Sequence, residues 1–215
     1  MSDAIRVGLI GYGYASKTFH APLISGTPGM TLAAVLSSDE KKVLADWPAV
    51  QVVAAPQALF SDPNIDLVVI PTPNDSHFPL AKAALEAGKH VVVDKPFTVT
   101  LAQARELEAI AKSEGLLLSV FHNRRWDSDF LTVKSLINEG LLGEVVYFES
   151  HFDRYRPQVR HRWREQGGPG SGIWYDLAPH LLDQVVNLFG LPVSMQVDLA
   201  QLRPGSQSTD YFHAV

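Results

Sequence analysis

Short, mainly apolar runs alternate with amphipathic stretches along the first 121 residues. The apolar runs lie at 5–10, 32–36, 67–70, 91–93 and 116–121. Runs without polar alternation are typical of strands buried on both faces of a parallel sheet. The stretches between them are compatible with helices, so strand and helix alternate at least four times. This order predicts an α/β domain of the Rossmann type, with a doubly wound parallel sheet.

Residue types at the expected helix ends support this interpretation. Asp75 or Ser76 is suited to cap a helix that ends at Gly88. Thr100 and Gln103 have the spacing of a capping box, in which each side chain bonds to the other residue's backbone N–H. The sequence therefore predicts two well-defined helices between the later strands.

The pattern changes after residue 121. Residues 127–139 predict a helix, 144–153 and 194–202 alternate like half-exposed antiparallel strands, and a second helix is expected over 176–189 after the glycine-rich stretch 166–172. We expect a first domain over 1–123 and a second, α+β domain with a mainly antiparallel sheet over 124–215. Residues 211–215 resemble an interrupted strand, so we expect this second domain to be incomplete in the chain.

A glycine turn follows the first strand and opens a helix. Its sequence is Gly11-Tyr12-Gly13-Tyr14-Ala15-Ser16. Glycines let the backbone approach a pyrophosphate closely, and the free N–H groups of the helix start stabilise its charge. Ser16 replaces the third glycine of the usual fingerprint, so the turn alone fits a sharp loop equally well. The strand before it and the helix after it favour dinucleotide binding.

The end of the second strand bears on the choice between NAD and NADP. NAD enzymes usually place an acidic residue there for the ribose hydroxyl, whereas NADP enzymes offer donors or cations to the 2'-phosphate. Here the strand ends at Ser37 and Ser38, with Lys41 and Lys42 beyond. This favours NADP and leaves NAD open, because Asp39 is also present. The alternative is that Asp39 and the lysines form a solvated helix start.

Lys95 lies at the carboxyl end of a predicted strand, in the sequence Asp94-Lys95-Pro96. Open α/β sheets bind ligands at that edge. The ammonium group could stabilise negative charge that develops on a substrate oxygen, although a lysine after a strand is often only solvated. Pro96 permits a cis peptide bond, but trans is the ordinary expectation.

A polar stripe follows one face of the helix expected over 176–189. Asp176, His180, Asp183 and Asn187 recur at helical spacing. A neutral imidazole can accept the proton of an alcohol, and a nearby carboxylate can orient it. The alternative is that Asp176 is an N-cap and His180 a surface residue.

Composition narrows the classes of function. Hydrophobic residues make up 46% and charged residues 19%, which is typical of a folded chain. The absence of cysteine excludes disulfides and thiolate chemistry, and no stretch has the apolar length of a membrane span. The net charge of −5 disfavours nucleic-acid binding. Seven of the ten arginines nevertheless lie between Arg124 and Arg164, and we interpret them as substrate, phosphate or interface contacts.

Taken together, these motifs resemble the glucose-fructose oxidoreductase, inositol dehydrogenase and rhizopine-catabolism (Gfo/Idh/MocA) oxidoreductases over the whole chain. The motifs that carry the resemblance are Gly11-Tyr12-Gly13, Thr72-Pro73-Asn74 with His77, Ala87-Gly88-Lys89-His90-Val91, Lys95-Pro96, and Asp176 with His180. Asp94 stands where most members have Glu. The stretches 122–127 and 209–213 are most similar to the NADP-dependent scyllo-inositol dehydrogenase branch.

The resemblance implies a catalytic set of Lys95, Asp176 and His180, with hydride transfer between NAD(P) and a secondary alcohol of a cyclic polyol or sugar. The expected cofactor-binding residues are Gly11, Tyr12, Gly13, Tyr14, Ser16, Ser37, Ser38, Thr72, Pro73, Asn74, His77 and Lys95. The expected substrate-binding residues are Asn123, Arg124, Trp163, Asp176 and His180. No metal is expected.

Two other classes of function remain open at this point. A protein that senses the NADP/NADPH ratio without catalysis would use the same turn, but would have no need of Lys95 and His180. A nucleic-acid module would bind DNA or RNA in a salt-dependent way, which we do not expect. For the enzyme we expect a small-molecule substrate, no membrane partner, a cytoplasmic location and a homo-oligomer when full-length.

Overall fold

The computed structural model describes residues 4–215, which form two compact units. The first extends to Phe121 and the second begins at His122. The boundary expected from the sequence lies two residues later, at 123.

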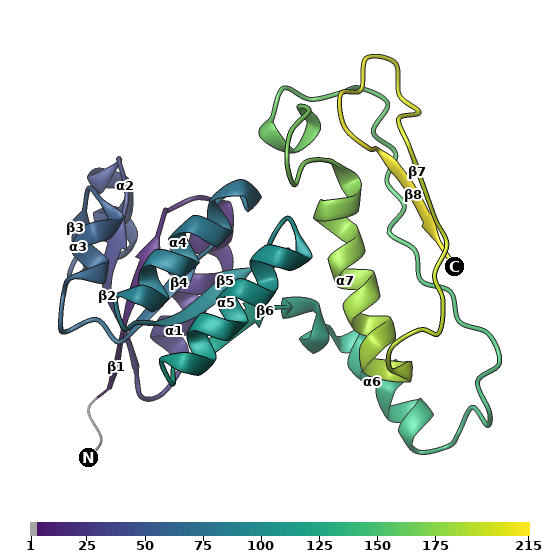
Figure 1. The fold of residues 1–215 in the computed structure, drawn as a ribbon, viewed down its shortest axis with the longest axis horizontal. Coiled ribbons are helices and arrows are strands. Elements are labelled where there is room, and N and C mark those ends of the chain that lie inside the picture. Colours follow the sequence, from purple (N-terminus) through teal and green to yellow (C-terminus); the bar gives the residue numbers. More distant parts are fainter. Residues whose placement is uncertain (1–3) are drawn as a thin grey trace. The chain divides into compact units, whose positions relative to one another are not determined.

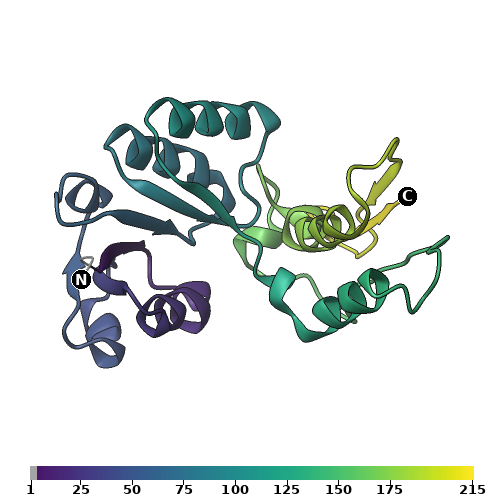
Figure 2. The same ribbon diagram turned by 90° about the horizontal axis from the view of Figure 1, so that it is seen from below.

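The first unit is built on a six-stranded, fully parallel sheet (Figures 1 and 2). Its strands are β1 (Ile5–Ile10), β2 (Met30–Leu36), β3 (Gln51–Val53), β4 (Leu67–Ile70), β5 (His90–Asp94) and β6 (Leu118–Phe121). The strand order β3-β2-β1-β4-β5-β6 reverses direction at β1 and β4. Such a reversal opens the ligand crevice of a doubly wound sheet at the carboxyl ends of its strands, which confirms the predicted fold.

Helices cover both faces of this sheet and bury two separate apolar cores. The helices are η1 (Ser16–His20), α1 (Ala21–Gly26), α2 (Glu40–Asp46), α3 (Pro56–Phe60), α4 (Asn74–Glu86) and α5 (Leu101–Ser113). On one face, Leu59, Leu85 and Leu107 from α3, α4 and α5 pack against the sheet. On the other, Ile24 and Val43 from α1 and α2 do so. Both faces of the strands are therefore buried, which explains their continuous apolar runs.

The helix ends agree only in part with the sequence prediction. The capping box of Thr100 and Gln103 is present at the start of α5. The predicted cap at Asp75 or Ser76 is wrong, because α4 begins at Asn74 and its N-cap is Pro73. The Ser76 hydroxyl instead lies 2.6 Å from the Pro73 carbonyl oxygen. The helix after the glycine turn starts as the single π-helical turn η1.

The second unit contains two longer helices and a small antiparallel sheet. Its elements are η2 (Asn123–Trp126), α6 (Ser128–Asn138), η3 (Trp163–Glu165), α7 (Gly172–Phe189), β7 (Val197–Ala200) and β8 (Tyr211–Ala214). Strands β7 and β8 pair with each other. The strand expected over 144–153 is wrong, since these residues have no regular secondary structure. Their alternating pattern finds no partner strand within the described residues, and an unpaired strand is not stable.

Helix α7 begins four residues before the expected start. Gly172 has a φ of +89°, and the Ile173 N–H donates to the Thr209 carbonyl oxygen at 2.6 Å. This contact with the segment before β8 fixes the first turn, and Ser171 is the N-cap. Asp176 therefore lies inside the helix, so its interpretation as an N-cap is wrong. Within residues 4–215, no helix has the length and apolar character needed to cross a membrane.

Candidate functional site

The glycine turn between β1 and η1 has the geometry that close approach to a phosphate requires. Gly11 has a φ of +88°, a region that side chains rarely adopt. A Cβ built on Gly13 would meet nothing within 4 Å, so its backbone borders open space. The Ser16 side chain is buried, and its Oγ forms no hydrogen bond to any described residue. The turn thus offers accessible backbone and one unused hydroxyl.

The Tyr12 side chain anchors this turn to the core. Tyr12 is 6% exposed; its hydroxyl donates to Asp46 Oδ2 at 2.9 Å and accepts from the Trp47 indole N–H at 2.8 Å. Burial and the hydrogen bond to Asp46 raise the pKa of Tyr12 to about 12, against the opposing effect of Trp47. Only the backbone of Tyr12 is therefore available to a ligand. Tyr14, by contrast, is 77% exposed.

Lys42 lies on α2, shortly after the end of β2, and its side chain reaches back to the same turn. Its Nζ donates to the Tyr12 carbonyl oxygen at 2.9 Å, which places an ammonium group beside the backbone of the glycine turn. Asp39 Oδ1 accepts the Lys42 N–H at 3.0 Å and is the N-cap of α2. Ser37 Oγ bonds locally within the loop, and Ser38 is exposed. The Asp39 carboxylate is thus committed to the helix start, as the alternative interpretation expected.

The loop after β4 and the first turn of α4 contain four of the residues expected at the cofactor, namely Thr72, Pro73, Asn74 and His77. Ser76 Oγ lies 2.7 Å from Thr72 Oγ1, and a Cβ on Gly11 would lie 3.8 Å from Thr72 Cγ2. His77 is fully buried. Its Nδ1 lies 2.8 Å from the Pro96 carbonyl oxygen, and its Nε2 lies 2.8 Å from the Thr72 carbonyl oxygen. Through these two contacts, His77 links the loop that follows β4 to the loop that follows β5. Asn74 is also buried.

Lys95 follows β5 and is held by its neighbour. Its backbone N–H donates to Asp94 Oδ1 at 2.7 Å, and the Lys95–Pro96 peptide bond is cis, not trans as expected. Asp94 Oδ2 lies 3.5 Å from Nε2 of His20, whose ring contacts Phe121 at 4.3 Å. Burial raises the pKa of Asp94, but His20 and the hydrogen bond from Lys95 outweigh it and hold this pKa below its ordinary value.

The expected acid–base residues of the second unit lie on α7. His180 is 8% exposed, so its interpretation as a surface residue is wrong. The centroids of the His180 and Phe152 rings lie 6.3 Å apart in an edge-to-face arrangement. The Arg124 guanidinium lies over the Phe152 ring, 5.1 Å from its centroid. Asp176 lies one helical turn earlier, with Oδ1 3.4 Å from Arg164 Nε. Asp183, from the same stripe, forms a two-point ion pair with Arg125 instead.

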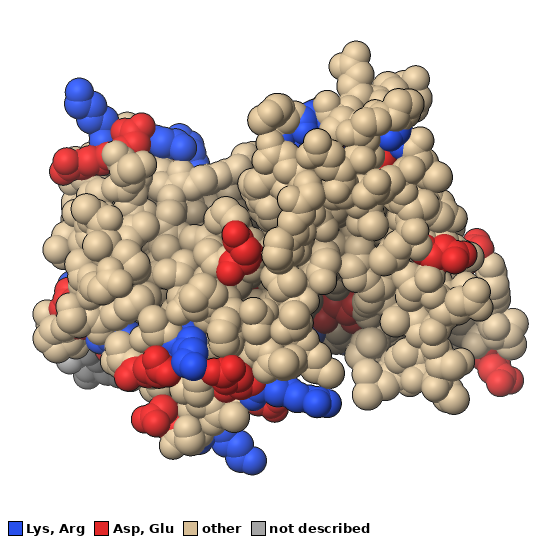
Figure 3. Space-filling view, turned by 45° about the horizontal axis from the view of Figure 1, so that its top comes forward, with Lys and Arg blue, Asp and Glu red and all other residues tan. Residues whose placement is uncertain are grey.

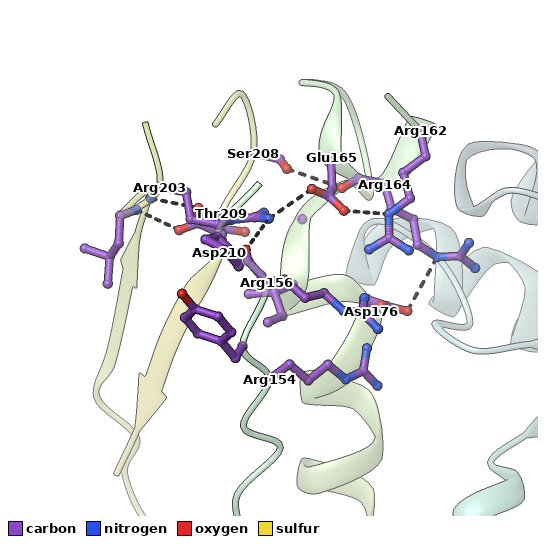
Figure 4. Close-up of a pocket in the computed structure, with 15 residues that line it drawn as sticks. Arg154, Arg156, Arg162, Arg164, Glu165, Asp176, Arg203, Ser208, Thr209 and Asp210 are labelled. Atoms are coloured by element: carbon purple, nitrogen blue, oxygen red, sulfur yellow. Dashed lines mark hydrogen bonds and ion pairs between the residues drawn. The ribbon is translucent and has the colours of Figure 1, made fainter. Parts of the chain in front are cut away.

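A pocket of about 340 Å³ opens beside Asp176 (Figure 4). Its walls come from the segment 154–157, η3, the first turns of α7 and the segment 202–210. Trp163 stacks under Arg164 at 4.3 Å but is not part of the wall. Asn123 is the first residue of η2 and also lies outside it. The volume suits a small molecule.

Sequence reasoning did not identify three groups that shape these sites. His20 reaches Asp94 from η1, 74 residues earlier in the chain. Asp46 and Trp47 hold Tyr12 from the end of α2. Each contact joins elements distant in sequence, and no local pattern marks it.

The comparisons with known proteins agree with this geometry. The model of the oxidoreductase family with an NAD-binding Rossmann fold, Gfo/Idh/MocA, matches residues 5–122. The model of that family's C-terminal alpha/beta domain matches residues 134–215. The chain belongs to the Gfo/Idh/MocA oxidoreductase family.

Individual relatives extend over the whole chain. It is 82% identical to "Uncharacterized oxidoreductase YdgJ" of Escherichia coli (strain K12), covering 100% of this chain and 62% of that protein. It is 40% identical to scyllo-inositol 2-dehydrogenase (NADP(+)) IolW of Bacillus subtilis (strain 168), over 98% of this chain and 59% of that protein. The chain thus spans about three fifths of the length of these relatives.

Solved structures show the same likeness. That of YPO2259 from Yersinia pestis has a TM-score of 0.93 at 73% identity, over 100% of this chain and 60% of that one. The structure of biliverdin reductase from Synechocystis sp. PCC 6803, in complex with biliverdin and NADP+, has a TM-score of 0.81 at 28% identity, over 98% and 66%.

Proposed function

We propose that this protein is an NADP-preferring dehydrogenase that acts on a secondary alcohol of a cyclic polyol or sugar. The observation that carries the proposal is the position of Asp176, which lines a small-molecule pocket one helical turn before the buried His180. Family membership supplies the reaction class, and the 40% identical IolW is named for an NADP(+)-dependent inositol dehydrogenase.

The residues of the first unit fit a dinucleotide. The positive φ of Gly11, the open space at Gly13 and the unused Ser16 hydroxyl suit a pyrophosphate at the helix start. Thr72, Pro73 and Asn74 follow β4 at the carboxyl edge of the sheet, where the nicotinamide half would bind. When bound, the nicotinamide would accept or donate the hydride.

The chain's own residues would handle the proton and the charge. His180 would accept the proton of the substrate hydroxyl as general base. The Lys95 ammonium would stabilise the negative charge that develops on that oxygen. Asp176 would orient one or both of these residues. His77, being buried between two carbonyl groups, would act by holding the Thr72 and Pro96 loops in place.

The preference for NADP is supported by Lys42, which offers a cation beside the glycine turn. The Asp39 carboxylate, which would repel a 2'-phosphate, is the counter-evidence, although it is held at the start of α2 as a helix cap. The solved relative that contains NADP+ is consistent with this choice. NAD is the alternative cofactor.

The proposal includes a cytoplasmic location, a homo-oligomer and no nucleic-acid partner. On the face drawn in Figure 3, basic and acidic side chains are interspersed and form no continuous basic surface. Together with the net charge of −5, this disfavours a polyanion as partner.

The decisive experiment is a cofactor-reduction screen of the protein with inositols and aldoses, run with NAD and NADP in parallel. A Lys95→Met variant should lose about 100-fold or more in kcat for the best substrate, because the developing charge loses its cation. Lys112→Met, at an exposed position of α5, is the control. A kcat within a few-fold of the wild type would refute the role of Lys95. NADP binding without turnover on any substrate would favour the sensor.

A further inference from the structure

Arginines dominate the wall of the pocket beside Asp176, which we call the arginine pocket. Its charged wall residues are Arg154, Arg156, Arg162, Arg164 and Arg203, with Glu165, Asp176 and Asp210. Five guanidinium groups against three carboxylates leave a formal excess of two positive charges. Such an excess in a concave wall attracts anions.

The three carboxylates are all engaged by three of the arginines. Arg203 lies 3.1 Å from Glu165 Oε2 and 2.9 Å from Asp210 Oδ2. Arg162 donates to Glu165 Oε1 at 2.6 Å, and Arg164 lies 3.4 Å from Asp176. Burial raises the pKa of Glu165, but these donors and the Arg160 N–H hold it below its ordinary value. This half of the wall is internally neutralised.

Arg154 and Arg156 make up the excess. Neither guanidinium forms an ion pair or hydrogen bond with another residue in the part of the chain that the structure describes, 4–215. Figure 4 shows both side chains extending to the same side as Asp176. Desolvation lowers the pKa of Arg156, and repulsion from Arg154, Arg160 and Arg162 lowers it further. Two cations without an ion-pair partner among the described residues therefore lie at one wall of a small-molecule pocket.

We propose that the arginine pocket binds the phosphate or carboxylate group of a small anionic ligand through Arg154 and Arg156. The guanidinium fork matches both kinds of anion with paired hydrogen bonds. Resting on the proposed function, we assign this ligand as the substrate, because Asp176 lines the same pocket. The substrate class is then a sugar or polyol that carries a phosphate or a carboxylate.

Calorimetric titration of the protein with matched ligands tests the proposal. The ligands are glucose, glucose 6-phosphate, gluconate, myo-inositol, an inositol monophosphate and inorganic phosphate, each in the presence of NADP. We expect at least one anionic sugar or polyol to bind at least about tenfold more tightly than its neutral parent. Arg154→Gln and Arg156→Gln should each remove about tenfold of that preference. Arg105→Gln, at an exposed position of α5, should leave it unchanged.

The melting temperatures of the two arginine variants distinguish a loss of binding from a loss of folding. Because the two guanidinium groups have no intramolecular partner, both variants should keep the wild-type melting temperature or exceed it. Equal binding of anionic and neutral ligands, or a preference that survives in both variants, would overturn the proposal. Inorganic phosphate binding as tightly as the phosphate esters would overturn the substrate assignment.

The two proposals can fail separately. Turnover of neutral polyols without any anion preference refutes the arginine pocket alone. Saturable anion binding that depends on Arg154, without turnover of any ligand, supports the pocket and refutes the dehydrogenase.

Discussion

At the residue scale, the glycine turn proposed to bind phosphate depends on the Tyr12 side chain as well as on its glycines. The Tyr12 hydroxyl links Asp46 and Trp47 and fixes the peptide that follows Gly11. Glycines give the turn its freedom, and a buried hydrogen-bonded ring then restricts it to one conformation. The turn is therefore ordered before any ligand binds.

Replacing Tyr12 by Phe should lower the free energy of unfolding by about 1–2 kcal/mol, because both hydrogen bonds of the buried Tyr12 hydroxyl, to Asp46 and to the partly buried Trp47, are lost. Urea denaturation followed by circular dichroism measures this. Tyr14→Phe is the matched control, since Tyr14 is mostly exposed. Equal stabilities of the two variants would contradict the anchoring role.

The Tyr12 hydroxyl should also make the stability of the protein depend on pH in the alkaline range. The pKa of Tyr12 is about 12 in the folded protein, against an ordinary value near 10. A raised folded pKa contributes stability that is complete below pH 10 and is lost as the pH rises through 12. Between these values the wild type should lose more stability than Tyr12→Phe. Parallel denaturation series at pH 9, 10 and 11 test the difference.

Lys42 and Lys41 offer a paired test of cofactor choice. Only Lys42 contacts the turn, through the Tyr12 carbonyl oxygen. Lys42→Ala should raise KM for NADP about tenfold and leave KM for NAD within twofold, since the proposed charge-assisted contact to the 2'-phosphate would be lost. Lys41→Ala should change neither. A similar loss for both cofactors would show that Lys42 supports only the turn.

Sequence reasoning located the residue types of the first unit but not their contacts. The glycine turn and Lys95 follow strands, and that local order marks the carboxyl edge of the sheet. The burial of His77 and the pairing of His20 with Asp94 arise from packing between distant elements. No spacing in the chain encodes them.

At the element scale, local signals at helix ends were reliable only in part, because Pro73 stands at the cap position expected at Asp75 or Ser76. The Thr100–Gln103 capping box involves one helix end only, and the structure contains it. The strand expected over 144–153 needed a partner that its own alternation could not supply. The early start of α7 likewise depends on Thr209, which lies 37 residues after Gly172.

The start of α7 yields a stability prediction. A Cβ on Gly172 would lie 2.9 Å from the Thr209 carbonyl oxygen, and the φ of +89° disfavours any side chain. Gly172→Ala should therefore cost about 2–4 kcal/mol. Gly26→Ala, at the end of α1 with nothing within 4 Å, should change stability by about 0.5 kcal/mol or less. Thermal denaturation compares them, and equal melting temperatures would disprove the close packing.

At the scale of the whole molecule, the two units differ in how they are held together. Both apolar core clusters and all six parallel strands belong to the first unit. The buried apolar side chains of the second unit are few, mainly Phe130, Leu177 and Leu181. Ion pairs such as Arg203 with Asp210 also join its segments, and such pairs stabilise less than apolar burial does.

We therefore expect residues 1–121 alone to fold and to bind NADP, because their core is complete within the unit. Residues 122–215 alone should lack a cooperative transition. Circular dichroism melts of both fragments, with fluorescence titration of NADP for the first, provide the measurement. A non-cooperative melt of the first fragment would contradict this division of stability.

The capping role of Asp39 restricts how the cofactor preference can be redesigned. Its carboxylate accepts the backbone N–H of Lys42, so removing it costs about 1 kcal/mol and loosens the lysine that approaches the turn. An engineer who wants an NAD enzyme should leave Asp39 in place. The exposed neighbour Ser38 is the better position for a new acidic group, since its exchange disturbs neither the cap nor the core.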